Sequence, residues 1–279
     1  MNTLLKFNKM KNLILGLTLL GSIGSYAMPS GYQVKKIEST KFRSVKNTAF
    51  AAGEMLRYRM HYGVIDAGEA VISVKETKKK VKGRSLLHVV GTGRSLSGFD
   101  MFFKVRDRYE SYIDKDGLFP WVFVRRVNEG GYKLEQDYTF FQHMKKMDNG
   151  KGKKMAVPSY VQDMISSFFY ARAQDYSNIK VGDEIEIKTM VDEELFNLKV
   201  KFMGKETIKL RKGKFRCMKF QPIVMEGRVF ESSEDLQVWI TDDENRIPIL
   251  AKANILVGSV KMEVVEYKGL LHPIAKVEK

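Results

Sequence analysis

Two acidic residues, Asp107 and Glu135, are the side chains in this sequence best suited to chemistry, because each stands among aromatic residues. A pair of carboxyl groups can act as general acid and base in glycoside hydrolysis, and strands distant in sequence can bring two acids together. The alternative is structural, because a cross-strand Arg125 or Arg126 would make Asp107 half of a buried ion pair. We favour the structural interpretation and expect no catalytic residue.

The four histidines and the single cysteine form no recognisable catalytic motif. His61, His88, His143 and His272 are scattered, and no Gly-x-Ser-x-Gly elbow accompanies them. Nucleophilic catalysis needs a nucleophile, a base and an orienting group in contact. His61 and His88 could face each other across strands, but surface or core positions are the simpler interpretation. Cys217 lies in an alternating stretch, so we expect a small buried hydrophobic residue rather than a reactive thiol.

Motifs for metals and cofactors are missing from the sequence. Neither Cys-x-x-Cys nor His-Glu-x-x-His occurs. Asp242, Asp243 and Glu244 are consecutive acids, but they lack the alternating oxygen spacing of a calcium loop. We expect them to form a solvated turn, and we expect the protein to hold no metal and no cofactor.

The first 27 residues have the three parts of a secretory signal peptide. Three lysines (Lys6, Lys9 and Lys11) precede an apolar run at 13–20, and small residues occupy the −3 and −1 positions of a cleavage site at Ala27. The apolar run is short for a bilayer span, although an uncleaved anchor is the alternative. No cysteine follows the run, so we expect no lipoprotein anchor.

Cleavage near Ala27 would leave a mature chain, 28–279, with no transmembrane span. Met10 is an alternative start of the same signal. Removing the three leader lysines lowers the formal net charge from +15 to +12. A basic surface suits anionic partners such as lipid headgroups, lipopolysaccharide or acidic glycans, and export makes nucleic acid the least suitable of them.

Most of the mature chain alternates between apolar and polar residues, which is typical of half-buried strands. Phe103 to Asp114 is the clearest strand, with Asp107 on its apolar face. We expect a turn at Asp66–Gly68 and basic hairpin tips at 78–83, 148–154 and 209–214. Three such tips at one end of a barrel would form a cationic rim, although lysine at turns also protects sheet edges from pairing. Further strands are expected at 184–191, 195–203, 206–211, 214–225, 228–240, 247–256 and 258–268.

One segment, 159–173, has apolar residues at helical spacing and is predicted to form an amphipathic helix that plugs a barrel end or covers a sheet. The fold class expected is all-β, a large antiparallel barrel or a two-sheet sandwich with this one helix. The predicted organisation is a signal peptide at 1–27, a poorly ordered leader at 28–50, a single β domain at 51–270 and a tail at 271–279. Two similar β halves within 51–270 are the alternative.

Several motifs together resemble a known family. Gly53-Glu54-x-Leu56-x-Tyr58, followed by Tyr62-Gly63-x-Ile65-x-Ala67-Gly68, resembles the opening of the bacterial exported proteins grouped as domain-of-unknown-function family 3108. Further stretches look like its Bacteroidetes branch: 103–112, 130–133, 213–217, 239–248 and 257–261. The resemblance spans roughly residues 50–270. It implies a β-rich periplasmic or outer-membrane-associated protein, and it implies no catalytic residue.

Three functions remain open from the sequence. The first is non-enzymatic binding of a lipid or glycan in a concavity lined by aromatic residues. The residues expected to face it are Phe123, Tyr138, Phe140, Phe168, Phe169 and Trp239. The second is a structural or assembly role with other envelope proteins through a sheet edge or basic rim. The third, an enzyme acting on envelope polymers, requires two acids, or an acid and a histidine, that converge in a cleft.

Overall fold

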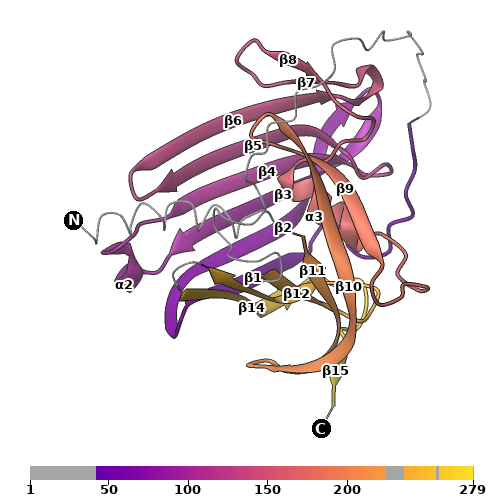
Figure 1. Cartoon of the computed structure of the whole chain (residues 1–279). Helices are drawn as coiled ribbons and strands as arrows, with labels where there is room; N and C mark the ends of the chain where they lie inside the picture. The colour runs from indigo at the N-terminus through magenta and orange to yellow at the C-terminus, as the bar shows by residue number, and fades with distance from the viewer. Residues whose placement is uncertain (1–41, 224–235, 256–257, 279) are drawn as a thin grey trace.

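Alternating side chains fold most of the chain into one antiparallel sheet of 15 strands (Figure 1). The computed structural model describes residues 42–223, 236–255 and 258–278. The first part of the sheet comprises β1 (Met55–Tyr62), β2 (Ile65–Val81), β3 (Arg84–Ser95), β4 (Arg106–Asp114), β5 (Pro120–Glu129), β6 (Tyr132–Phe141), β7 (Lys146–Asp148) and β8 (Lys154–Ala156). The second part comprises β9 (Glu184–Val191), β10 (Glu194–Leu210), β11 (Gly213–Pro222), β12 (Leu236–Thr241), β13 (Pro248–Ile255), β14 (Gly258–Lys268) and β15 (Lys276–Val277).

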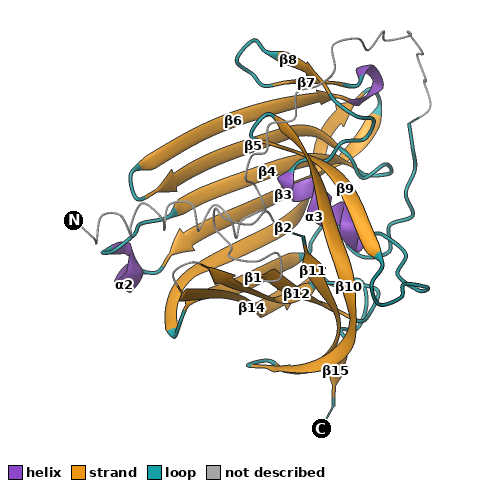
Figure 2. Ribbon diagram, viewed as in Figure 1, coloured by secondary structure: helices purple, strands orange, loops and turns teal. Residues whose placement is uncertain are grey.

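Strand neighbours follow chain order within each part, and the two parts join where β1 pairs with β14. The sheet therefore runs from β8 at one edge to β9 at the other and does not close. Figure 2 shows that it curls around the helix α3 (Met164–Arg172). The expected all-β antiparallel fold is confirmed, and the two expected β halves are parts of one open sheet.

Side chains, rather than strand pairing, connect the two sides of the opening. Asp192 and Glu193 form the tight turn between β9 and β10. Asp192 accepts hydrogen bonds from Arg125 on β5 at 2.9 Å and from Gln136 on β6 at 3.0 Å. Glu193 accepts one from Asn149, beyond β7, at 2.8 Å. This polar seam makes the open sheet barrel-like.

The first hairpin turns earlier than the sequence predicts. The chain reverses at Gly63 and Val64, and Asp66–Gly68 belongs to β2, so the predicted turn at these residues is wrong. Gly63 supplies the positive φ, +57°, that a tight turn requires. Gly68 serves a different purpose, because a Cβ there would lie 2.9 Å from the carbonyl oxygen of Arg94 on the neighbouring strand.

The helix α3 begins at a buried cap. Asp163 accepts hydrogen bonds from the backbone N–H groups of Ile165 and Ser166, both at 2.7 Å, and the Ser166 hydroxyl accepts one from the Asp163 N–H. The Ser111 hydroxyl, on β4, donates to the same carboxylate at 2.6 Å. The predicted helix at 159–173 is confirmed in its central part, and its first turn is tied to the inner face of the sheet.

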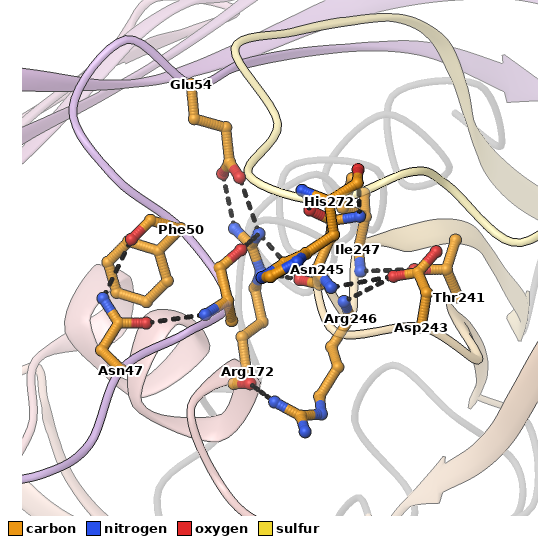
Figure 3. A network of polar contacts seen from close by, with 11 residues as sticks. Asn47, Phe50, Glu54, Arg172, Thr241, Asp243, Asn245, Arg246, Ile247 and His272 are labelled. Atoms are coloured by element: carbon orange, nitrogen blue, oxygen red, sulfur yellow. Dashed lines mark hydrogen bonds and ion pairs between the residues drawn. The ribbon is translucent and has the colours of Figure 1, made fainter.

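The last turn of α3 is anchored by an ion pair inside the protein (Figure 3). Arg172 donates two hydrogen bonds to Glu54, at 2.6 and 2.8 Å, and the side chains are only 2% and 1% exposed. The same guanidinium donates to the carbonyl oxygens of Asn245, between β12 and β13, and of Ala49. Arg172 therefore joins the helix to the start of β1 and to a distant turn.

Both ends of the described chain pack against the sheet. Ala49 and Phe50 are buried, and the Val45 N–H donates to the Asp116 carbonyl at 2.8 Å. The prediction of a poorly ordered leader is wrong for residues 42–50, because Phe50 fills the space beside α3. The predicted tail contributes β15, which pairs with β11. The predicted signal peptide, residues 28–41 and 224–235 lie outside the described residues.

The inner face carries most of the core. One cluster includes Phe50, Phe123, Tyr138, Phe140 and Phe169 and fills the side of the interior between β2–β6 and α3. None of the helices among the described residues is long and apolar enough to cross a bilayer.

Replacing Arg172 with leucine is expected to destabilise the protein by about 3–5 kcal/mol, because Glu54 would remain buried without its partner. The free energy of unfolding in urea measures this change. The matched control is Arg126→Leu, which breaks the exposed ion pair with Asp137 on the outer face and should cost about 1 kcal/mol or less. Equal losses of unfolding free energy in the two variants would contradict the assigned role of Arg172.

Candidate functional site

The interior of the curled sheet holds a cavity of about 380 Å³. It lies between α3, the strands β1–β3 and the strands β10–β14. Its wall is almost entirely apolar, as one residue from each of six strands illustrates: Met60, Ile72, Val200, Phe220, Val238 and Met262. An apolar space of this kind can take up a small apolar or amphipathic molecule.

Small residues on adjacent strands create the space. Gly68 and Ala70 on β2 lie beside Gly91 and Gly93 on β3, and all four line the cavity. A Cβ added to Gly91 would lie 3.6 Å from the terminal methyl of Ile165 on α3, an ordinary contact distance. Larger side chains at these positions would therefore enter the space between the sheet and the helix.

The helix α3 separates this hollow region from the filled core. Ile165, Phe168 and Ala171 line the cavity. Phe169 packs against Phe50 with ring centroids 4.7 Å apart, in an edge-on arrangement that belongs to the filled core. Because both ends of the helix are fixed to the sheet, the cavity wall on this side is rigid.

A buried polar cluster lies at one side of the cavity. Asp107 and Tyr109, which face inward from β4, line the cavity. The neighbouring strand β5 directs Arg125 and Glu129 to the same face, and all four residues are at most 4% exposed. The guanidinium of Arg125 lies 5.6 Å from the centre of the Tyr109 ring. An apolar wall with a few convergent polar groups is the usual composition of a ligand site.

The carboxyl groups of Asp107 and Glu129 lie close enough to influence each other, and among the described residues Asp107 Oδ2 and both Glu129 carboxyl oxygens are buried without a hydrogen-bond partner. Two ionised carboxylates repel each other, so their proximity in a buried place favours the neutral form of one of them. Burial raises the pKa of both groups, and the pKa of Glu129 reaches about 9, with Asp107 adding to the effect. The Asn128 N–H donates to Asp107 at 2.9 Å and favours its ionised form. Glu129 is therefore the protonated member at neutral pH.

This arrangement offers a neutral carboxyl donor and a carboxylate acceptor beside an apolar cavity. It can hold the polar end of an amphipathic molecule.

The structure separates the two acids that the sequence singled out. Asp107 is buried on the inner face, whereas Glu135 is exposed on the outer face opposite Arg126. The hypothetical pair of Asp107 and Glu135 is therefore wrong. The proposed ion pair of Asp107 with arginine is also not the main contact, because Arg125 forms its ion pair with Asp192.

Glu129 was not among the predicted site residues, although the alternation of side chains on β5 could have identified it. On β5 the side chains of Phe123, Arg125, Val127 and Glu129 share one face, as period-two alternation requires. Pairing of β4 with β5 then places Glu129 diagonally across from Asp107. The cross-strand register had to be known before this pair could be recognised.

The histidines do not converge. His61 on β1 contacts Asp66, with 2.7 Å between Nδ1 and the carboxylate, and His88 on β3 contacts Glu110 on β4. The strand β2 lies between β1 and β3, so His61 and His88 do not face each other. His272 lies 2.7 Å from the Thr48 carbonyl in the anchoring network of Figure 3.

The consecutive acids form a turn stabilised by the protein's own donors. Asp243 accepts hydrogen bonds from the N–H groups of Asn245 and Arg246, and Asp242 pairs with Lys205 at 2.9 Å. Within the described ranges, no cluster of three or more His, Cys, Asp or Glu side chains is arranged to hold a metal.

Cys217 is fully buried, as predicted, and burial raises the pKa of its thiol to about 12. The thiol is therefore kept in its neutral form, and the residue packs as part of the apolar core beneath β11.

The expected aromatic lining is correct only in part. Phe168 lines the cavity, whereas Phe123, Tyr138, Phe140 and Phe169 pack in the filled core. Trp239 is on the opposite, outer face, because its neighbours Val238 and Ile240 line the cavity. Its indole N–H donates to Glu206 at 2.6 Å, and the ammonium groups of Lys219 and Lys252 lie over the ring.

The three basic tips do not form one rim. The tips between β2 and β3 and between β10 and β11 lie at the same end of the sheet, but the β7–β8 tip contacts the β9–β10 turn through Lys153 and Glu193. The predicted cationic rim made of all three tips is therefore wrong.

The pH dependence of stability tests the raised pKa of Glu129. The pKa of Glu129 is raised above its unfolded value. Its contribution to the free energy of unfolding is therefore complete below about pH 4.5 and is lost as pH rises toward 9. We expect the free energy of unfolding to fall between pH 7 and pH 9 by at most about 1.4 kcal/mol per pH unit. Glu129→Gln, which mimics the protonated form, should flatten this decline.

The matched control is Glu135→Gln, on the outer face of the neighbouring strand, which should keep the decline of the unmodified protein. An unchanged decline in Glu129→Gln would show that Glu129 is ionised in the folded state.

Comparison with solved structures finds a barrel-like protein of similar fold. A β-barrel-like protein of domain-of-unknown-function family DUF1849 from Brucella abortus aligns over 79% of this chain and 99% of its own, with a TM-score of 0.52 and 9% identity. A candidate lipoprotein from Parabacteroides distasonis aligns over 82% of this chain and 100% of its own, with a TM-score of 0.35 and 12% identity. The first likeness supports the fold alone.

A candidate exported protein with a YmcC-like fold from Bacteroides fragilis aligns over 81% of this chain and 100% of its own, with a TM-score of 0.29 and 12% identity. The search of curated proteins found no match. The family described as "Protein of unknown function (DUF3108)" matches residues 57–265, from β1 through β14 and including every strand that surrounds the cavity, and the chain belongs to this family.

Proposed function

We propose that this protein is an exported cell-envelope protein that binds a lipid inside its curved sheet, without catalysing a reaction. The observation that carries the proposal is the apolar cavity of about 380 Å³ beside α3. Small-molecule sites typically have volumes of roughly 300–1,000 Å³. The apolar wall favours a lipid over a glycan, because a glycan's hydroxyl groups would lose their hydrogen bonds to water there.

The polar cluster supports an amphipathic ligand. Asp107 and Tyr109 border the cavity, and Glu129 supplies a neutral carboxyl group directly behind them. A headgroup with hydroxyl or amide groups could exchange hydrogen bonds with this cluster while its chain remains among apolar side chains. An anionic headgroup is suited less well, because burial disfavours a second ionised acid beside Asp107.

The envelope location is part of the same proposal. It is supported by the lysine-rich, apolar and small-residue segments that precede Ala27 and by the net charge of +12 that would remain after cleavage. A periplasmic or outer-membrane-associated position follows from that processing.

A structural role through strand addition has less support. The edge strand β8 has only three residues. The other edge, β9, is met by Gln162, whose backbone bonds to Lys188 and Met190. Short or covered edges discourage pairing with another chain.

One observation favours an enzyme as a second candidate: Asp107 and Glu129 converge beside the cavity, and burial raises the pKa of both carboxyl groups. Such a pair can act as acid and base. Turnover of an envelope polymer by the purified protein, abolished by Asp107→Asn, would replace the binding proposal.

Native mass spectrometry of protein purified from an exporting host is expected to reveal a copurifying lipid that organic extraction removes. Ala70→Phe and Ala251→Phe place a ring in the cavity, because both alanines line it. Each substitution should reduce the bound fraction at least about tenfold, since a ring and the ligand cannot occupy the same volume.

The matched control is Ala156→Phe, at an exposed position of β8, which should retain the lipid. Thermal unfolding of each variant checks that folding is preserved. A clean apo mass for the unmodified protein, or equal lipid in all variants, would contradict lipid binding in this cavity.

A further inference from the structure

Large apolar side chains are exposed together at one end of the sheet. Val64 is 99% exposed and Ile65 56%, at the turn from β1 to β2, and Met101 is 85% and Phe102 65% exposed just after the short helix α2 (Ser97–Asp100). Tyr132, at the turn from β5 to β6, is 44% exposed. We refer to these five residues as the apolar rim.

Backbone hydrogen bonds show that the three segments of the apolar rim are neighbours. The Leu96 N–H donates to the Ala67 carbonyl at 3.0 Å, which joins the α2 segment to the start of β2. The Gly130 N–H donates to the Lys104 carbonyl at 2.8 Å, which joins the same segment to the β5–β6 turn. In Figure 1 these connections lie at the left side of the sheet, around α2.

Single exposed apolar residues are common on protein surfaces, whereas a contiguous group of large ones marks a contact surface. Met101 and Phe102 are consecutive and mostly exposed, so covering them would remove considerable apolar area from water.

The charges around the apolar rim are mainly positive. Lys104 and Lys133 are exposed and form no ion pair among the described residues. The nearby acids have cationic partners: Asp66 with Arg59, and Asp100 with Arg106. Exposed apolar side chains flanked by lysines are complementary to an anionic lipid bilayer, whose headgroups attract the cations while the apolar residues enter the interface.

The cavity reaches the surface beside the apolar rim. Phe99 of α2, Tyr62 at the end of β1, and Arg94, whose side chain is 61% exposed, all line the cavity. We infer that the apolar rim docks onto an anionic lipid bilayer and presents the cavity to the membrane. This inference rests on the proposed lipid-binding function, because it assigns the route by which the ligand enters.

The test measures partition of protein recovered from an exporting host onto vesicles of phosphatidylcholine alone or with one-quarter phosphatidylglycerol, by co-sedimentation. We expect binding to the anionic vesicles, weakened at least about tenfold by Met101→Ser with Phe102→Ser, since two inserted side chains are lost. Lys104→Glu with Lys133→Glu should remove the preference for anionic vesicles.

The matched control is Met144→Ser with Val181→Ser, because these exposed apolar residues lie away from the apolar rim, and it should bind as the unmodified protein does. All variants have the same N-terminus, so differences in vesicle binding among them arise from the substituted residues. Equal binding of the Met101/Phe102 variant and the unmodified protein, or no binding to anionic vesicles, would overturn the inference. A dimer in solution that the same variant dissolves, without vesicle binding, would also overturn it.

The Ala70→Phe variant separates this inference from the proposed function. Its cavity is filled while the apolar rim is intact, so vesicle binding should persist although the copurifying lipid is lost. Vesicle binding by a protein that never carries a lipid would refute the proposed function and leave the docking surface standing.

Discussion

The buried ion pair of Arg172 and Glu54 is the constraint on which the interior of this protein depends. Taking both charges out of water is costly, and the cost is offset only because the guanidinium also satisfies the carbonyl groups of Asn245 and Ala49. The main effect of such a pair is to fix the positions of the elements that it joins, rather than to add net stability. It holds α3 at one position inside the sheet, and the capped carboxylate of Asp163 holds the other end.

A helix fixed at both ends explains why one side of the interior is filled and the other is hollow. Phe169 closes the filled side, and the small residues of β2 and β3 face the other side, where α3 cannot move inward to fill the gap. Interiors normally pack without voids of this size, so this open apolar space beside α3 is the feature on which the proposed lipid binding rests. The polar cluster of Asp107 and Glu129 supports the same interpretation, since buried carboxyl groups are costly unless they serve a purpose.

Period-two alternation made the strands and the inward position of Asp107 predictable, and helical spacing made α3 predictable. What remained out of reach depended on the register between strands. Glu129 could be paired with Asp107 only after β4 and β5 were aligned, and Arg172 could be paired with Glu54 only after the chain had folded over 118 residues. Trp239 was assigned to the wrong face because both faces of β12 carry apolar residues. Gly68 resembled a turn residue, although its role is to let two backbones approach closely.

The seam at Asp192 and Glu193 sets this sheet apart from a continuous barrel. A wall closed by a full ladder of backbone hydrogen bonds can widen only by breaking many of them at once. Here the wall is completed by contacts from one tight turn to Arg125, Gln136 and Asn149 and by two backbone hydrogen bonds between Gln162 and β9. Fewer bonds therefore hold the wall along this line than between paired strands. An occupant longer than the resting cavity could be accommodated by parting that line, while the strands and the anchored helix keep their positions.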